Sequence, residues 1–257
     1  MAETLVPRNT VSGDFDGTWR LYRASLRRSF VPAALLALLW ATLLAKLMGR
    51  LDAVAQDDVW LLVSQTEDLL YSSAFWWVLV AAWCASTLLF CMQVAIVHGV
   101  AVEAPIGFGT ALVRALRSFP GALVAGAVYV ALTTIASLAL LVPGAWLWGM
   151  WQLWPVALVA EGLGPTAALG RSWVLMRGAW WPGTTLTTVV TLVALFIPLA
   201  CNGVAGTVAA LAGLGAAQSQ QAALLAWAAS AAFTAPLLPA ALVAVHVAQL
   251  RARAMGV

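Results

Sequence analysis

The sequence predicts an all-α protein, a polytopic transmembrane helical bundle, and three observations support this fold class. Apolar residues make up 63% of the 257 residues and charged residues 9%, against about 45–50% and about 25% in soluble domains. Apolar stretches recur along the chain, and most reach the length of about 20 residues that crosses a bilayer. Basic residues gather at alternate ends of these stretches. The segments between them are too short for a separate soluble catalytic domain.

Six spans are expected, arranged as three hairpins. Their predicted bounds are near 30–48, 74–98, 120–142, 145–160, 183–204 and 222–249. The fourth span is the shortest. Residues 1–17 hold three acids and precede the first apolar run, so we expect a flexible cytoplasmic tail there and a single membrane domain over 18–257. Pro236 and Pro239 should kink the sixth span, because proline removes a backbone donor.

The lysines and arginines predict how the chain sits in the membrane. Only Lys46 and Arg50 fall at one set of span ends. The other eleven fall at the opposite set, and they are Arg8, Arg20, Arg23, Arg27, Arg28, Arg114, Arg117, Arg171, Arg177, Arg251 and Arg253. The positive-inside rule then places both termini in the cytoplasm of a multi-pass protein of the bacterial inner membrane. Such arginines suit anionic lipid headgroups as partners, and the sequence shows no nucleic-acid-binding motif.

One arrangement occurs three times on the basic side of the chain. A basic amphipathic segment is followed by one or two aromatic residues and then by a proline in the first turn of a span, where its missing N–H is tolerated. The three segments begin at Arg23, Arg114 and Arg171. Basic amphipathic segments of this kind lie in the membrane interface. We therefore predict three units, each a cytoplasmic interfacial amphipathic helix followed by a hairpin of two spans.

The most distinctive stretch runs from residue 143 to 186. It contains a Pro-Gly turn, an apolar run ending in glutamate, Ala-Leu, Arg-Ser and a Gly-X-aromatic sequence before the next span. The residues are Pro143, Gly144, Glu161, Ala168, Leu169, Arg171, Ser172, Gly178 and Trp180. They resemble a broad bacterial group of six-span proteins that includes the membrane domain of some glycerophosphoryl diester phosphodiesterases and the YciC-like inner-membrane proteins. The resemblance implies an all-helical membrane protein of unassigned role. It does not imply phosphodiesterase activity, because this chain has no room for the soluble hydrolase domain.

Charged residues at the cytoplasmic span ends form the first candidate site. Glu103 and Glu161 close the second and fourth spans, and we expect each to orient the following helix by pairing with Arg114 or Arg171. The alternative is a headgroup pocket built from Glu161, Arg171 and Arg177. The whole candidate set for a headgroup or structural polar site is Glu103, Glu161, Arg114, Arg117, Arg171 and Arg177.

The fifth span is unusually polar. Thr187, Thr191 and Asn202 fall on one stripe of a helix. Threonine hydroxyls bond the backbone of their own helix, so packing is one interpretation and a water-lined path is the other. His98 and His246 lie near the same membrane surface and could face one another. No further ligand recurs at helical spacing with either, so no metal or cofactor is expected.

These patterns lead to two hypotheses about function. No motif of a known hydrolase, nucleotide-binding or metalloenzyme site occurs in the sequence. The first hypothesis is a non-catalytic inner-membrane protein that interacts with lipids and supports membrane organisation or a partner complex, including a homo-oligomer. The alternative is a small-solute or lipid transporter or channel with a polar path along the fifth span.

Overall fold

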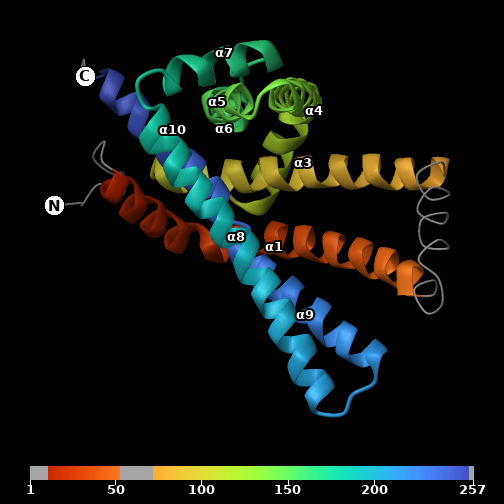
Figure 1. Ribbon diagram of the computed structural model, residues 1–257. Helices are drawn as coiled ribbons and strands as arrows, with labels where there is room; N and C mark the ends of the chain where they lie inside the picture. The colour runs from red at the N-terminus through yellow and green to blue at the C-terminus, as the bar shows by residue number, and fades with distance from the viewer. Residues whose placement is uncertain (1–10, 53–71, 255–257) are drawn as a thin grey trace.

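A computed structural model describes residues 11–52 and 72–254, which form nine α-helices and contain no strand (Figure 1). The helices are α1 (Val11–Asp52), α3 (Ser73–Ala101), α4 (Phe108–Ala139), α5 (Leu141–Trp151), α6 (Trp154–Ala160), α7 (Pro165–Met176), α8 (Trp180–Leu211), α9 (Ala216–Thr234) and α10 (Leu237–Ala254). Five segments are long and apolar enough to cross a membrane, and they are Phe15–Leu47, Ser73–Ala101, Phe108–Ala139, Trp180–Leu211 and Ala216–Ala254. The chain is therefore an all-helical integral membrane protein.

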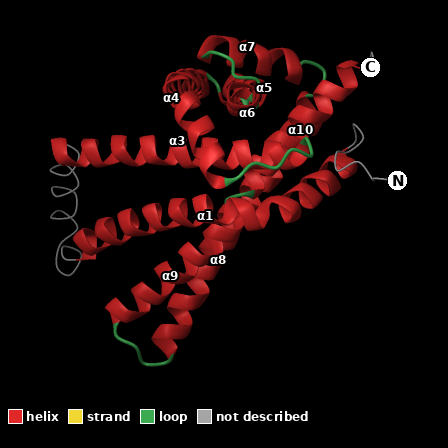
Figure 2. Ribbon diagram, turned by 180° about the vertical axis from the view of Figure 1, so that it is seen from behind, coloured by secondary structure: helices red, strands yellow, loops and turns green. Residues whose placement is uncertain are grey.

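The long helices diverge in pairs from one end of the molecule. In both views α1 lies beside α3, and α8 lies beside α9 (Figures 1 and 2). α4 and α5 run antiparallel, because only Leu140 separates them and the Tyr129 hydroxyl on α4 donates to the Trp148 carbonyl on α5 at 3.4 Å. The start of α1 and the end of α10, which carries Arg251 and Arg253, lie at the common end, and Arg253 donates to the Val174 carbonyl of α7. We call this the basic end.

The centre of the molecule is α10. Every residue from Pro239 to Ala248 is buried, and α10 packs against α1, α3, α6, α7 and α8. Alanines supply much of this surface, and small residues let neighbouring helices approach closely. α1 is also tied to the end of α9, because the Tyr22 hydroxyl donates to the Phe233 carbonyl at 2.8 Å.

The fourth expected span differs most from the prediction. Instead of one helix over 145–160, the chain forms α5 of 11 residues and α6 of 7 residues, with a turn at Gln152 and Leu153 between them. At about 1.5 Å per residue, neither reaches across a hydrocarbon core of about 30 Å. Pro155 explains the break, since it has no N–H to continue the helix from Trp151. Six spans in three hairpins therefore stay a prediction.

The expected interfacial helices are separate in only one unit. The segments that begin at Arg23 and Arg114 continue without a break into the first and third spans, through Pro32 in α1 and Pro120 in α4. Only α7 is a helix of its own. A membrane helix tolerates an internal proline where neighbouring groups satisfy the freed carbonyl, which is why two of the three prolines do not end the helix before them.

Two further predictions concern the ends of the chain. α1 begins at Val11, so residues 11–17 of the expected flexible tail are helical, while residues 1–10 lie outside the described residues. The kink expected in the sixth span is confirmed, because α9 ends at Thr234 and α10 begins after Pro236.

Candidate functional site

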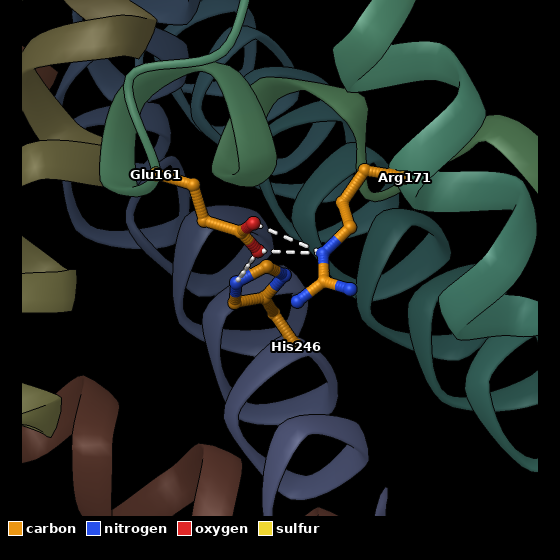
Figure 3. A network of polar contacts seen from close by, with 3 residues as sticks. All are labelled: Glu161, Arg171 and His246. Carbon is orange, nitrogen blue, oxygen red and sulfur yellow. Dashed lines mark hydrogen bonds and ion pairs between the residues drawn. The ribbon is translucent and has the colours of Figure 1, made fainter.

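A network of three side chains joins three helices at the basic end (Figure 3). Glu161 follows the last residue of α6, Arg171 lies on α7 and His246 lies on α10. The Arg171 Nε atom is 2.9 Å from Glu161 Oε2 and 3.1 Å from Oε1, and the two side chains are 33% and 24% exposed. His246 Nε2 lies 3.2 Å from Glu161 Oε1 and is fully buried. The expected pairing of Glu161 with Arg171 is confirmed.

Two more residues extend the network electrostatically. His98 on α3 interacts with His246, with Glu161 and with Arg114 on α4. That the two histidines face one another stays a prediction. His246 is at hydrogen-bond distance from Glu161, but neither of its ring nitrogens has the geometry of a hydrogen bond to any described residue, and the same is true of His98 Nδ1. The described residues contain no group of three His, Cys, Asp or Glu that could hold a metal ion.

The expected pairing of Glu103 with Arg114 is wrong. Glu103 is exposed and has no ion pair among the described residues. The reason is its position at the end of α3. Glu103 takes the left-handed φ of 57°, as Gly162 does with φ 68° after α6, so Glu103 corresponds to Gly162 and not to Glu161. Counted from the end of the preceding helix, Glu103 stands one residue later than Glu161 does. Its carboxylate therefore does not repeat the contact that Glu161 makes.

The helices that follow these two turns do repeat the same arrangement of an N-cap glycine and an arginine. α4 starts after the N-cap Gly107 and α7 after the N-cap Gly164. Arg114 and Arg171 both lie seven residues after their N-cap. Among the residues that the structure describes, Arg171 meets a carboxylate and Arg114 does not, so a shared sequence pattern has produced two different electrostatic environments.

The remaining predicted arginines lie at the surface. Arg117 and Arg177 are exposed, and Arg253 of α10 donates to the Val174 carbonyl of α7. Arg171 already shares its charge with Glu161. The geometry therefore favours the role of Glu161 in orienting α7 over a headgroup pocket built around Arg171.

A cavity of about 450 Å³ lies between α1, α3, α4, α8, α10 and the junction of α5 with α6. No Asp, Glu, Lys, Arg or His lines it. Six aromatic residues do, and they are Trp40, Trp83, Phe90, Tyr129, Trp148 and Trp154. Its polar lining is Ser86, Thr87, Gln152, Thr187 and Thr191. Two of the three predicted path residues therefore line this cavity.

Asn202 does not join the other two path residues. It is half-buried nearer the far end of α8 and is not part of the cavity lining. The continuous stripe expected from the sequence is therefore interrupted, because the far part of α8 extends with α9 away from α3, α4 and α5 (Figure 1). The self-bonding expected of the threonines is confirmed, since the Thr191 hydroxyl donates to the Thr187 carbonyl at 2.7 Å.

The break between α5 and α6 borders the cavity and is held by side chains from two other helices. The Ser172 hydroxyl of α7 donates to the Met150 carbonyl at 2.9 Å and accepts from the Leu153 N–H at 3.0 Å. The Thr187 hydroxyl of α8 donates to Gln152 Oε1. Gln152 Nε2 lies 3.5 Å from the Met176 sulfur. The interrupted helix thus keeps hydrogen-bond partners without crossing the bilayer as one rod.

Sequence reasoning missed Gln152, Ser172 and Ser86 as site residues. Gln152 had a readable signal, because an amide in the middle of an apolar span is costly and marks a functional position. Ser172 stood only among the family-like residues, and its bonds to the turn at Leu153 depend on how α7 folds back over α5. Nothing in the sequence distinguishes Ser86 from other small polar residues of membrane helices.

Comparisons with protein-family models, curated proteins and solved structures found no match to this chain. The resemblance to the six-span bacterial group stays a prediction.

Proposed function

We propose that the chain is a non-catalytic protein of the bacterial inner membrane that binds a lipid between its helices and so supports membrane organisation or a partner complex. The observation that carries this proposal is the cavity. Its volume of about 450 Å³ falls in the range of about 300–1,000 Å³ typical of small-molecule sites. A mostly apolar lining with a few polar groups is also typical of such sites.

The basic end supports the cytoplasmic orientation in this proposal. Arg117 and Arg177 are exposed, and exposed arginines at the cytoplasmic surface of a membrane attract the anionic headgroups of the inner leaflet. Glu161 pairs with Arg171 of α7 and lies 3.2 Å from His246 of α10. We propose that these surface arginines position the protein in the bilayer, while the cavity holds its ligand.

The test is native mass spectrometry of the protein extracted together with its surrounding lipid. We expect one retained lipid molecule per chain. Gly126→Leu should remove it, because Gly126 lines the cavity and a Cβ there already meets Trp154 at 3.6 Å. The matched control is Gly203→Leu on α8, where a Cβ meets nothing within 4 Å. The proposal would be contradicted if Gly126→Leu kept the lipid. It would also be contradicted if neither the wild type nor Gly203→Leu retained any lipid.

A second candidate function is the transport of a small solute or lipid. The break between α5 and α6 favours it, because transporters form their binding sites from interrupted helices whose irregular backbone lines a cavity. Thr187, on the neighbouring α8, contacts Gln152 at this break. Liposomes that contain the protein should then show flux.

The flux test has a matched pair of variants on α8. Thr191→Leu should suppress flux because Thr191 lines the cavity. Thr207→Leu should not, because Thr207 is exposed and donates only to the Gly203 carbonyl of its own helix. Silent wild-type liposomes would remove the transport hypothesis and leave lipid binding in place.

A further inference from the structure

We infer that the cavity takes an uncharged amphiphile whose flat ring carries a carbonyl group, a molecule of the quinone type. This inference rests on the proposed function, that the cavity binds a ligand dissolved in the membrane. It goes further by naming the chemical class of that ligand from the charge, the shape and the hydrogen-bonding groups of the lining.

The charge of the lining excludes an anionic headgroup. No lining residue carries a carboxylate, an amine, a guanidinium or an imidazole group. The arginines of the basic end, including Arg171 beside Glu161, are not part of the lining. A phosphate in the cavity would lose its hydration without gaining a counter-ion, which is strongly unfavourable. The part of the ligand that lies in the cavity must therefore be neutral.

The aromatic residues favour a flat ring. Trp154 and Trp83 approach the same point of α4, because Gly126 has no side chain there, and a Cβ at Gly126 would lie 3.6 Å from Trp154 and 3.9 Å from Trp83. Trp40 and Trp148 line the same cavity. Aromatic side chains pair with other rings in offset or edge-to-face arrangements that add to simple burial. A ring therefore complements this lining better than an acyl chain.

The polar groups of the lining offer hydrogen-bond donors. The Ser86 hydroxyl accepts from Trp40 Nε1 at 3.2 Å, and its own proton has no acceptor among the described residues. Gln152 Oε1 is occupied by Thr187, whereas Gln152 Nε2 has only the Met176 sulfur at 3.5 Å, and a thioether is a weak acceptor. Gln152 Nε2 also lies beside Gly183, and neither Met176 nor Gly183 lines the cavity. The Ser86 hydroxyl is thus the donor that lacks a partner at the lining, and a ligand carbonyl, which accepts but does not donate, would satisfy it.

The size of the cavity agrees with a ring and not with water alone. Its volume of about 450 Å³ equals roughly 15 water molecules at about 30 Å³ each. An apolar lining gives so many waters few partners, whereas each buried water typically makes about three hydrogen bonds.

The experiment measures binding of decylubiquinone to the full chain in nanodiscs of phosphatidylcholine. Saturable quenching of tryptophan fluorescence and native mass spectrometry should both report one probe per chain. Ser86→Ala should weaken binding about fivefold, the usual effect of one lost hydrogen bond. Gly126→Leu should abolish saturable quenching, and Gly203→Leu should bind as the wild type does.

Each other outcome overturns a stated part of the inference. If phosphatidylglycerol displaces the probe and Gly126→Leu releases that lipid, the neutral class is wrong although the cavity still binds lipid. If hexadecane competes with decylubiquinone as well as unlabelled decylubiquinone does, and Ser86→Ala has no effect, the inference that the ligand carries a carbonyl group is wrong. If no probe and no lipid is retained, the proposed function fails as well. Ser86→Ala removes one oxygen atom, so it decides the matter even where Gly126→Leu does not fold.

Discussion

α8 and the segment formed by α9 and α10 have similar hydropathy, but they differ in how much of each is buried. Their most apolar windows have mean hydropathies of 2.0 and 1.8, yet 11% of the α8 window is buried against 67% of the other. α8 exposes Leu195 and Phe196, whereas α10 buries Ala240 and Ala244. Since lipid tails are as apolar as leucine, hydropathy alone does not select the central helix. Small side chains do, because they permit close packing.

The comparison also separates polar groups into two kinds. On the exposed part of α8, the Thr207 hydroxyl bonds only its own helix. Near α10 and α7, Ser172 bonds the interrupted α5–α6 segment, and Thr187 contacts it in addition to carbonyls of its own helix. The central region should therefore be sensitive to substitutions that the lipid-facing region tolerates, and four predictions test this difference.

The largest effect is expected for Ser172→Ala. The substitution leaves the buried Leu153 N–H and Met150 carbonyl without their partner, and unsatisfied buried groups cost about 1–3 kcal/mol each, so the free energy of unfolding should fall by about 2–5 kcal/mol. Unfolding in mixed detergent micelles measures it. Ser230→Ala is the control, because Ser230 donates only to carbonyls of its own helix. Equal losses of unfolding free energy in the two variants would show that the hydrogen bonds of Ser172 at the break between α5 and α6 do not stabilise the protein more than those of Ser230.

Overpacking of the central helix should come next. Ala244→Leu adds three carbons at a site that is 2% exposed, and such insertions cost about 1–3 kcal/mol. Ala200→Leu on α8 adds the same atoms where the side chain is exposed, and surface changes stay within about 0.5 kcal/mol. The midpoint of thermal unfolding compares the two. A similar drop for both would mean that α8 is covered by another protein or another copy.

A pair of glycines should respond with opposite signs. A Cβ at Gly149 of α5 would lie 2.4 Å from Trp180 Nε1 and 2.5 Å from Thr184 Oγ1, so Gly149→Ala should destabilise by about 1–2 kcal/mol. A Cβ at Gly203 meets nothing within 4 Å, so Gly203→Ala should stabilise α8 by up to about 1 kcal/mol. Unfolding curves of both variants give the sign. Stabilisation by Gly149→Ala would contradict the close packing of α5 on α8.

The smallest effect is expected at the basic end. Glu161→Gln removes a charge from a pair whose side chains are 33% and 24% exposed, and partly exposed ion pairs contribute at most about 1 kcal/mol. The protein should therefore express normally, with a small loss of stability that shrinks at high salt. Glu103→Gln should change nothing measurable, because Glu103 has no ion pair among the described residues. Lost expression of Glu161→Gln would instead make this network essential for folding.

Much of the arrangement was readable because it follows from local patterns. Runs such as 74–98 and 183–204 lie within α3 and α8, since apolar length is a property of the sequence alone. The contact of Glu161 with Arg171 was also predictable, because both lie around one short turn. The failure of the same reasoning at Glu103 came from a shift of one residue in the turn, which side-by-side reading of two segments cannot detect.

The candidate site was only half predicted. Thr187 and Thr191 were readable as a polar stripe of one helix. Their neighbours in the cavity, including Trp40 of α1 and Ser86 of α3, come from distant parts of the chain. No periodicity within one segment specifies which helices will adjoin it.

By itself the sequence determined that the chain is apolar, helical and built to cross a membrane, because composition and the length of apolar runs decide whether a segment lies in lipid or in water. It also determined which end is basic. Only the tertiary structure decided that 145–160 divides into α5 and α6, and that α10 rather than α8 is central. The physical reason is that both outcomes depend on contacts between helices. Ser172 must reach the turn at Leu153, and alanines must meet neighbours that hydropathy does not identify.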